Sequence, residues 1–287
     1  HRVHRRQRQM CIRDSHSTGL MLGLCACIRV GASTLIKRKF SASSFWREAS
    51  EFNTTLFVYV GELCRYLANQ EPNEFEENNP IRAMVGNGLR PDLWDAFRNR
   101  FNVEMICEIY GASEGNALFM NLLNKEKTIG MTNVDVELIK YDVAEDSIFK
   151  DSNNKYQKVE FGKPGLLINK ISDNSIFNGY TDPKESEKKV LRNVFDEGDA
   201  WFNTGDLIQE IDVGYALGRR HFQFVDRIGD TFRWKSENVS TNEVAEILNG
   251  HSSISMANVY GVKVPNAEGR AGICLLYTSD AADDGLC

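Results

Sequence analysis

Residues 56–69 read LFVYVGELCRYLAN, and this stretch decides the fold class. Its first part, Leu56–Val60, is a short apolar run of β-branched and aromatic side chains, which is typical of a buried strand. Its second part, Glu62–Asn69, carries apolar side chains at helical spacing. The stretch therefore predicts a strand that leads directly into a helix.

The same alternation continues along the chain. Ile81–Val85 predicts a second strand, Pro91 suits the first turn of a helix, and Met105–Tyr110 predicts a third buried strand. One face of the helix after Pro91 is apolar and consists of Leu93, Trp94, Phe97 and Phe101. Strands that alternate with helices pair in parallel, and ligands collect at the carboxyl ends of such strands. We therefore expect an α/β fold with functional residues in the loops after the second and third strands.

The later part of the chain has a different pattern. Apolar and polar residues alternate within Ile129–Ile171, which predicts a smaller antiparallel region. Phe222–Val225 and Ala257–Val264 predict further strands. Between them, Ser240 and Glu243 have the spacing of a capping box, which marks the start of a helix. We expect this helix to point three side chains inward, namely Val244, Ile247 and Leu248.

Composition and charge exclude several classes of protein. A chain of 287 residues, 42% of them hydrophobic, can bury a sizeable core in one to two domains. A formal net charge of −6 argues against a nucleic-acid binder, which needs a basic face. Seven cysteines without C-x-x-C spacing or histidine partners indicate neither a zinc site nor a disulfide framework. This cysteine pattern fits a reducing compartment, so we expect a cytoplasmic protein. The apolar run Leu20–Val30 contains Arg29 and is too short to span a bilayer.

The two ends of the chain do not match its middle. Residues 1–15 hold five arginines without apolar periodicity, and residues 274–287 follow a strand pattern abruptly. Both segments resemble translated cloning or sequencing adaptors, so we expect them to be non-native flanks. The alternatives are a basic arm that touches anionic lipid and an acidic tail.

Two motifs follow predicted strands. The first is GNGLRP at 86–91, whose two glycines let the backbone approach a flat ligand closely, although the motif also fits a tight strand-to-helix turn. The second is YGASEG at 110–115. The ring of Tyr110 can stack on a purine, Ser113 can bond a phosphate oxygen, and Glu114 offers the hard oxygen ligand that Mg²⁺ prefers. Its alternative is a turn whose serine and glutamate cap the next helix.

Two further motifs lie in the second half of the chain. In WFNTGDL at 201–207, Asp206 follows a glycine turn and could receive both hydroxyls of a ribose, although a solvated aspartate in a turn is also common. In DRIGDTFRWKSENV at 226–239, Arg227 could hold a ribose or phosphate through its planar guanidinium. Gly229 in the same run is a natural hinge. The alternative for this run is a solvated hairpin rich in salt bridges.

In this order, the four motifs resemble those of the adenylate-forming superfamily of acyl-CoA synthetases, luciferases and peptide-synthetase adenylation domains. The resemblance is closer to the very-long-chain acyl-CoA synthetase and fatty acid transport protein family. It rests on segments that cover most of the chain between its flanks: YVGELCRYL (59–67), GNGLRPDLW (86–94), YGASEGN (110–116), GDAWFNTGDL (198–207), FVDRIGDTFRWKSENVSTNEVA (224–245) and VYGVKVPNAEGRAG (259–272).

This resemblance implies a fold and an activity. The fold is that of an adenylate-forming enzyme, with a partial large AMP-binding domain over residues 16–228 and the start of a small α+β domain over residues 229–273. The activity is that of an ATP-dependent long-chain fatty acid–CoA ligase. The fatty acid carboxylate would attack the α-phosphate of Mg·ATP to give an acyl-adenylate and pyrophosphate, and the thiol of coenzyme A would then displace AMP. Because the substrate partitions into lipid, peripheral contact with the inner face of a membrane is also implied.

The resemblance also assigns residues. The nucleotide would be bound by Gly86, Asn87, Gly88, Tyr110, Gly111, Asp206 and Arg227, with Asp206 on the ribose hydroxyls. The phosphates and Mg²⁺ would be met by Ser113, Glu114 and Arg233, with Glu114 as the metal ligand. Gly229 stands at the hinge between the domains. The path of coenzyme A would pass Trp234, Lys235 and Ser236, and HSTG at 16–19 would help to line the acyl site.

Some parts of the family pattern are missing. The Ser/Thr/Gly-rich phosphate loop, expected upstream of His16, is absent, and so is the late lysine that assists adenylation, because the match stops at Gly272. Such groups stabilise the charge that develops on the phosphates. We therefore expect this chain by itself to be inactive or nearly so, although its parent protein is an enzyme. Ser236 stands where the pattern has glycine, and its side chain would crowd the second half-reaction.

The sequence leaves two other functions open. One is an adenylating ligase for a different carboxylic acid, such as a bile acid or a carnitine-like substrate. The other is a non-catalytic lipid-uptake or scaffold protein that uses the same fold. Against the scaffold stands the presence of four polar residues that it would not need, namely Ser113, Glu114, Asp206 and Arg227.

Overall fold

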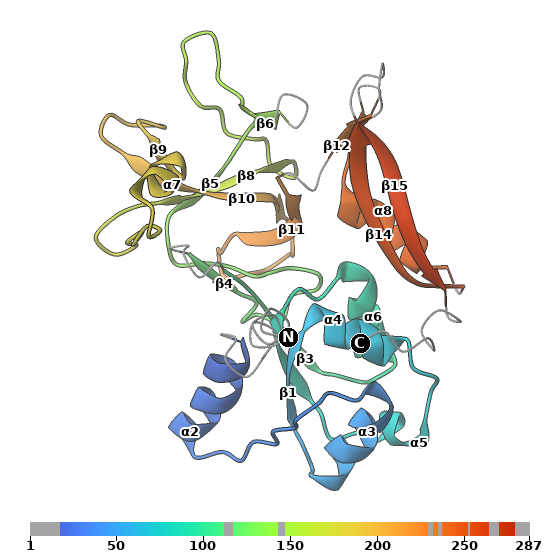
Figure 1. Ribbon diagram of the computed structural model, residues 1–287. Helices are drawn as coiled ribbons and strands as arrows, with labels where there is room; N and C mark the ends of the chain where they lie inside the picture. The colour runs from blue at the N-terminus through green and yellow to red at the C-terminus, as the bar shows by residue number, and fades with distance from the viewer. Residues whose placement is uncertain are drawn as a thin grey trace, which may run out of the picture. The chain divides into compact units, whose positions relative to one another are not determined.

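The computed structural model describes residues 18–111, 117–142, 147–228, 232–234, 237–251, 253–263 and 270–278 (Figure 1). It divides into two compact units. Unit 1 consists of His1–Tyr110 and Met120–Lys127, and unit 2 consists of Gly111–Phe119 and Thr128–Cys287. The predicted division at Gly229 falls outside the described residues and stays a prediction.

The described part of unit 1 begins, at Thr18, with three helical segments. These are η1, a π-helix over Thr18–Cys25, then α2 (Ala26–Val30) and α3 (Ala42–Glu51). The sequence analysis did not predict α3, which buries Trp46 and Ala49. In the described residues no helix is long and apolar enough to cross a membrane.

Strands and helices then alternate as predicted. The order is β1 (Leu56–Val60), α4 (Gly61–Ala68), α5 (Glu74–Glu77), β2 (Ala83–Asn87), α6 (Pro91–Asn99) and β3 (Met105–Gly111). The sheet has the order β1-β2-β3-β4, where β4 is Leu118–Met120, and the first three strands are parallel. The parallel pairing confirms the expected α/β character of this part of the chain.

The second strand starts later than Ile81, where the sequence analysis placed it. Ile81 is buried, but its backbone N–H donates to the side chain of Asn79 at 2.9 Å rather than to a neighbouring strand. The strand pairing begins at Ala83, which lies opposite Leu56. The local asparagine turn therefore delays the strand by two residues, since β2 begins at 83 and not at 81.

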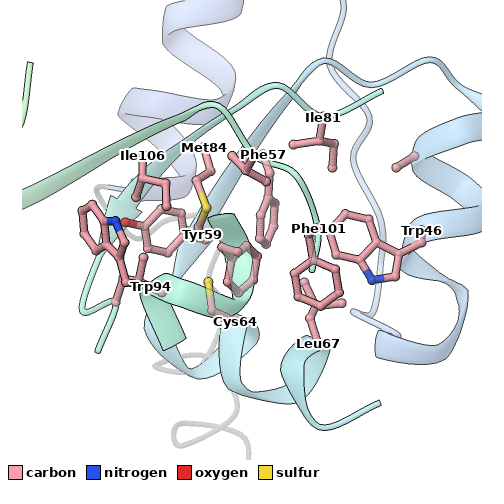
Figure 2. Packing of buried hydrophobic residues seen from close by; sticks show 14 residues of the cluster. Trp46, Phe57, Tyr59, Cys64, Leu67, Ile81, Met84, Trp94, Phe101 and Ile106 are labelled. Carbon is pink, nitrogen blue, oxygen red and sulfur yellow. The ribbon is translucent and has the colours of Figure 1, made fainter. Parts of the chain in front are cut away.

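The core of unit 1 is aromatic. The apolar face predicted for α6 is confirmed in Trp94, Phe97 and Phe101, which are almost completely buried. The centroid of the Phe101 ring lies 4.9 Å from that of Phe97 and 4.4 Å from that of Trp46 in α3. Figure 2 shows Phe101 beside Trp46 in this core. Such aromatic contacts add to the free energy gained by burying apolar surface.

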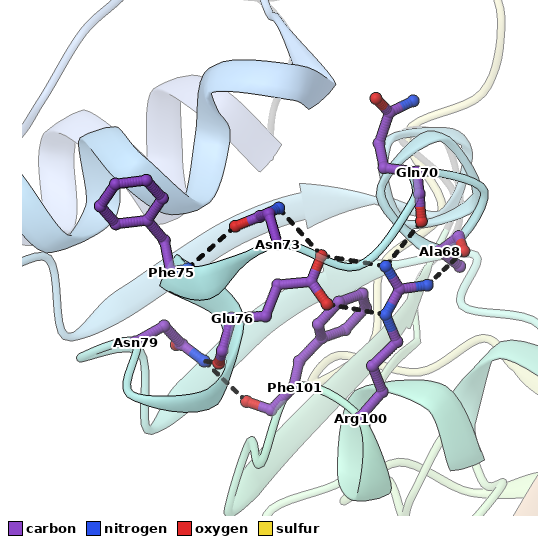
Figure 3. A network of polar contacts seen from close by, with 8 residues as sticks. All are labelled: Ala68, Gln70, Asn73, Phe75, Glu76, Asn79, Arg100 and Phe101. Atoms are coloured by element: carbon purple, nitrogen blue, oxygen red, sulfur yellow. Dashed lines mark hydrogen bonds and ion pairs between the residues drawn. The ribbon is translucent and has the colours of Figure 1, made fainter.

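A buried ion pair joins the end of α6 to α5. Arg100 Nε lies 2.8 Å from a carboxylate oxygen of Glu76, and its other nitrogens donate to the backbone oxygens of Ala68 and Gln70 (Figure 3). Asn73 donates a further hydrogen bond to the same carboxylate at 3.0 Å. The charge of Glu76 is thus matched by a cation and by hydrogen bonds, which a buried carboxylate requires.

Unit 2 contains the antiparallel region that the sequence predicts. Its main strands are β5 (Val136–Ile139), β8 (Pro164–Lys170), β9 (Val190–Arg192), β10 (Ala200–Ile211) and β11 (His221–Arg227), in the order β11-β10-β8-β5 with β9 beside β10. The short pair β6 (Tyr141–Asp142) and β7 (Ser147–Ile148) and the helix α7 (Pro183–Lys188) lie between them along the chain. Ile139, Ile168 and Trp201 lie in the core of this sheet.

The last part of unit 2 contains the predicted capped helix. The elements are β12 (Phe232–Trp234), β13 (Glu237–Val239), α8 (Thr241–Asn249), β14 (Ile254–Lys263) and β15 (Arg270–Thr278). Ser240 caps α8 by accepting from the N–H of Glu243, as expected. β15 pairs with β14 through Thr278, so residues 274–278, which the sequence analysis sets apart as a flank, form part of a strand.

One inward residue of α8 was predicted wrongly. Val244 and Leu248 pack on the small core around Phe232, but Ile247 is 73% exposed, and Ala245 is buried instead. Successive residues of a helix are turned by about 100°, so a face centred on Ala245 and Leu248 leaves Ile247 outside it.

Candidate nucleotide site

The glycine motif after β2 is held against the neighbouring strand and helix. A Cβ on Gly86 would lie 2.1 Å from the backbone oxygen of Tyr59, so no larger residue fits there. Gly88 has a φ of +79°, in the left-handed region that favours glycine. A Cβ on Gly61, the first residue of α4, would lie 1.7 Å from the oxygen of Gly88. The close approach of backbone predicted for this motif is therefore present.

A buried carboxyl group lies beneath this loop. Glu108 in β3 is 4% exposed. Its Oε1 accepts hydrogen bonds from the backbone N–H groups of Gly88 and Leu89, the second at 3.1 Å, and its Oε2 accepts from the hydroxyl of Tyr59. The sequence analysis missed Glu108, although an acidic residue inside an otherwise apolar strand was a signal that could have found it.

Burial changes the acidity of this group. Desolvation raises the pKa of Glu108 from 4.5 to about 8, and the hydrogen bonds from Tyr59, Leu89 and Gly88 offset only part of this effect. Burial also raises the pKa of Tyr59 well above its ordinary value, and the nearby carboxyl adds to the shift. The loop thus rests on a buried carboxyl group that holds its proton to a higher pH than an exposed glutamate does.

Another polar contact reaches the loop from the start of the described chain. Thr18 in η1 donates from its hydroxyl to the side-chain oxygen of Asn87 at 2.7 Å. Thr18 belongs to the HSTG segment that was expected to help line the acyl site, while His16 and Ser17 lie outside the described residues. The structure therefore brings part of that segment to the loop.

The second motif is described only at its start. Tyr110 and Gly111 end β3, which runs parallel to β2 with Glu108 opposite Gly86. The loops after β2 and β3 therefore begin at the same edge of the sheet, as expected for an α/β ligand site. Ser113 and Glu114 lie outside the described residues, so their predicted contacts with phosphate and Mg²⁺ stay predictions.

The third and fourth motifs meet in unit 2. Asp206 in β10 lies opposite Arg227 in β11, and Arg227 Nε is 3.4 Å from Asp206 Oδ1. The register of β10 against β8 shifts between Asn203 and Leu207, and Gly205 in this bulge has a φ of +79°. The side chain of Asp206 is 9% exposed, whereas that of Arg227 is 72% exposed. Asp206 is therefore a buried strand residue rather than a solvated turn residue.

A second buried carboxylate lies next to this pair. Asp226 accepts hydrogen bonds from the side chains of Ser240 and Asn242 at 2.9 and 2.8 Å and from the N–H of Thr241 at 3.0 Å. These donors form the beginning of α8. Asp226 therefore ties β11 to the helix beyond the predicted hinge, a role that the sequence analysis did not foresee.

The remaining predicted residues are not described in full. Gly229, Lys235 and Ser236 lie outside the described residues. Arg233 and Trp234 are described only as backbone of β12, opposite Asn238 and Glu237. Their predicted contacts with phosphate and coenzyme A stay predictions.

Comparison with known proteins identifies relatives over most of the chain. The sequence profile of the AMP-binding enzyme family matches residues 6–181. The medium/long-chain-fatty-acid–CoA ligase FadD6 of Mycobacterium tuberculosis is 41% identical over 273 residues, which cover 95% of this chain and 45% of that protein. Long-chain fatty acid transport protein 6 of Mus musculus is 43% identical and covers 90% of this chain and 42% of its own length. Long-chain fatty acid transport protein 2 of Rattus norvegicus is 46% identical, over 90% of this chain and 42% of that protein.

These relatives confirm the resemblance stated from the motifs, and the chain spans 42–45% of their length. Solved structures agree on the fold. ATP-bound MatB from Rhodopseudomonas palustris superposes with a TM-score of 0.70 at 16% identity, over 94% of this chain and 49% of that one. The anthranilate CoA ligase AuaEII in complex with anthranoyl-AMP gives 0.65 at 17% identity, over 91% of this chain and 46% of that one. With more than half of its residues matched by the profile, the chain belongs to the AMP-binding enzyme family.

Proposed function

We propose that the protein containing this chain activates long- or very-long-chain fatty acids with ATP. The fatty acid carboxylate attacks the α-phosphate, an acyl-adenylate and pyrophosphate form, and the thiol of coenzyme A then displaces AMP. The relatives named above as fatty-acid–CoA ligase and long-chain fatty acid transport proteins support this substrate class. Because such acids partition into lipid, peripheral contact with a membrane belongs to the proposal.

The observation that carries the proposal is the pair formed by Asp206 and Arg227. A nearly buried carboxylate with a guanidinium at 3.4 Å offers two acceptor oxygens and a set of planar donors. The hydroxyls of a ribose can donate to both oxygens of Asp206, while Arg227 donates to the ribose or to a phosphate oxygen. A scaffold protein would have no need to bury an acceptor beside an exposed cation in this way.

Other residues take the roles that the family resemblance implies. Tyr110 and the backbone of Gly86–Gly88 line the adenine. Ser113 and Arg233 meet the phosphates, and Glu114 supplies a carboxylate oxygen to Mg²⁺, a hard cation that prefers such ligands. Trp234, Lys235 and Ser236 lie along the path of coenzyme A, and Gly229 is the hinge.

Titration of AMP and Mg·ATP into this chain by calorimetry tests the nucleotide site. Asp206→Ala should weaken AMP binding about 10-fold or more, because it removes the acceptor of two hydrogen bonds to a charged group. Asp212→Ala is the matched control, since Asp212 is an exposed residue whose side chain accepts from the N–H of Gly214 in the turn after β10. Equal loss in both variants, or no loss in Asp206→Ala, would contradict the assignment.

The reaction itself is tested on a version extended at both ends to the length of the relatives. We expect it to form palmitoyl-AMP from palmitate and ATP, and palmitoyl-CoA when coenzyme A is added. Faster turnover of a bile acid or a carnitine-like acid than of palmitate would mean that the protein activates that class of acid instead. An extended protein that binds no nucleotide would favour a non-catalytic lipid-binding role.

A further inference from the structure

Glu108 occupies an unusual place for an acidic side chain. It comes from the middle strand pair of the sheet in unit 1, where it lies opposite Gly86, and its carboxyl group turns under the loop that follows β2. Oε1 accepts from two successive backbone N–H groups of that loop, those of Gly88 and Leu89. Those N–H groups lie where the chain leaves the strand, so they have lost their ladder partners and need another acceptor.

We propose that Glu108 is the positioning residue of the nucleotide loop, holding the backbone of Gly88 and Leu89 in the shape that accepts adenine. The proposal rests on the proposed function for the identity of the ligand. In the proposed reaction, Glu108 touches no reacting atom. It acts through the loop, in which Gly86 and Gly88 have no side chain that could hold the backbone in place.

The surroundings of Glu108 favour this role over simple packing. A residue that only filled space in an aromatic core would be apolar, because a buried carboxyl group costs free energy unless its hydrogen bonds are made. Within the part of the chain that the structure describes, the hydrogen bonds of its carboxyl come from Tyr59, Gly88 and Leu89, and no cation pairs with it. Two of these three donors belong to the loop.

The geometry also says which replacements should work. Glutamine keeps an oxygen for the two loop N–H groups and can donate its amide hydrogens to the oxygen of Tyr59. Methionine has nearly the same shape but offers only a weak acceptor. Glu108→Gln should therefore preserve the loop, and Glu108→Met should leave two buried N–H groups without a good partner.

The first measurement is backbone amide exchange of Gly88 and Leu89 in this chain without nucleotide. In Glu108→Met these two amides should exchange about 10-fold faster or more, while Glu108→Gln stays within about 3-fold of wild type. Glu76→Met is the matched control, since Glu76 is also a buried carboxylate of unit 1 but bonds to Arg100 and Asn73. It should leave the exchange of the loop amides unchanged relative to the rest of unit 1.

The second measurement is the affinity for AMP. Glu108→Met should weaken it about 10-fold, Glu108→Gln by no more than about 3-fold, and Glu76→Met not at all. In the extended enzyme the same loss should appear in the KM for ATP more than in kcat, because the loop binds the nucleotide and does not touch the reacting atoms. Should Glu108→Met fail to fold, Tyr59→Phe/Glu108→Met replaces both polar side chains at nearly constant shape and carries the same expectations.

Several outcomes would overturn the proposal. They are unchanged exchange of Gly88 and Leu89 in Glu108→Met, an equal effect of Glu76→Met, or a Glu108→Gln variant as impaired as Glu108→Met. If Asp206→Ala abolishes AMP binding while Glu108→Met does not, the proposed function stands and the positioning role is wrong. If wild type binds no AMP at all, the nucleotide assignment fails, and the amide exchange alone decides whether Glu108 holds the loop.

Discussion

At the scale of single residues, Glu108 should make the stability of unit 1 depend on pH. Its pKa is raised from 4.5 to about 8 in the folded chain, so between these values the folded state holds a proton that the unfolded state has lost. The contribution of Glu108 to stability should therefore be greatest below about pH 4.5, fall by about 2–5 kcal/mol towards pH 8, and change little above that. The titratable groups beside it are Tyr59, Cys64 and Cys107, whose raised pKa values keep them neutral over this range.

Urea unfolding at pH 6 and pH 8 checks this expectation. The difference in unfolding free energy between the two pH values should be smaller in Glu108→Gln than in wild type. Equal differences in the two proteins would show that Glu108 ionises in the folded chain as readily as in the unfolded one.

Arg100 should be needed chiefly because Glu76 is buried. Arg100→Leu leaves that carboxylate without its cation and should lower the unfolding free energy by about 3 kcal/mol or more. The double variant Glu76→Leu/Arg100→Leu removes both charges and should recover part of the loss. Denaturant unfolding of wild type, Arg100→Leu, Glu76→Leu and the double variant gives the coupling free energy between the two side chains. A double variant no more stable than Arg100→Leu would count against this account.

Polar residues differ in how far the sequence reveals them. Asp206 and Arg227 were predicted because they belong to motifs with glycine and aromatic neighbours, and the structure brings them together. Glu108 and Asp226 were not predicted, because each is one acidic residue in a strand. Their burial depends on what covers them, a loop for Glu108 and the start of α8 for Asp226.

At the scale of elements, the contact between α4 and the loop after β2 should tolerate no side chain at Gly61. The Cβ of alanine would overlap the oxygen of Gly88, so Gly61→Ala should move the helix or the loop and cost about 1–3 kcal/mol of stability. AMP affinity should fall with it. Gly23→Ala is the control, because a Cβ there meets no atom within 4 Å.

Urea unfolding followed by the fluorescence of the tryptophans measures both glycine variants. Gly61→Ala with the stability and AMP affinity of wild type would mean that α4 and the loop can separate without loss. A Gly23→Ala variant destabilised as much as Gly61→Ala would mean that the loss does not come from the close contact with Gly88.

Elements were predictable where local pattern and burial agree. β1 was predicted to the residue, and α6 from its proline and its apolar face. β10 was not predicted as one strand, since the bulge at Gly205 interrupts the alternation that marks a strand. Ile247 was misplaced because three apolar residues of α8 suggested a wider buried face than the small core beneath the helix can cover.

At the scale of the whole molecule, each unit contains a hydrophobic cluster made of its own buried residues. Phe97 lies in the core of unit 1 and Ile168 in that of the sheet in unit 2. Phe97→Ala should cost about 3–5 kcal/mol in unit 1 through lost burial and the cavity left behind. Amide exchange should then quicken mainly in peptides of unit 1, and a uniform increase over both units would mean that they unfold together.

The α/β class, the antiparallel region and the membership of an adenylate-forming fold could all be predicted from the sequence. Motifs are the only basis for the predicted domain boundary at Gly229. The same holds for the roles predicted for Ser113, Glu114 and Lys235. The roles proposed for those residues depend on ligands and on movement between domains, and neither is determined by the periodicity of side chains.

Asp206 and Arg227 differ greatly in their exposure to water, and this difference separates the arrival of a nucleotide from its retention. At the proposed site, the exposed guanidinium would attract a phosphate from about a Debye length away, roughly 8 Å at physiological salt, before any contact forms. The carboxylate lies in a strand with neighbours on both sides. In the proposed site it would bind the ribose only after water has left the ribose. We therefore expect added salt and changes at Arg227 to slow association, whereas changes at Asp206 shorten the time that a nucleotide stays bound.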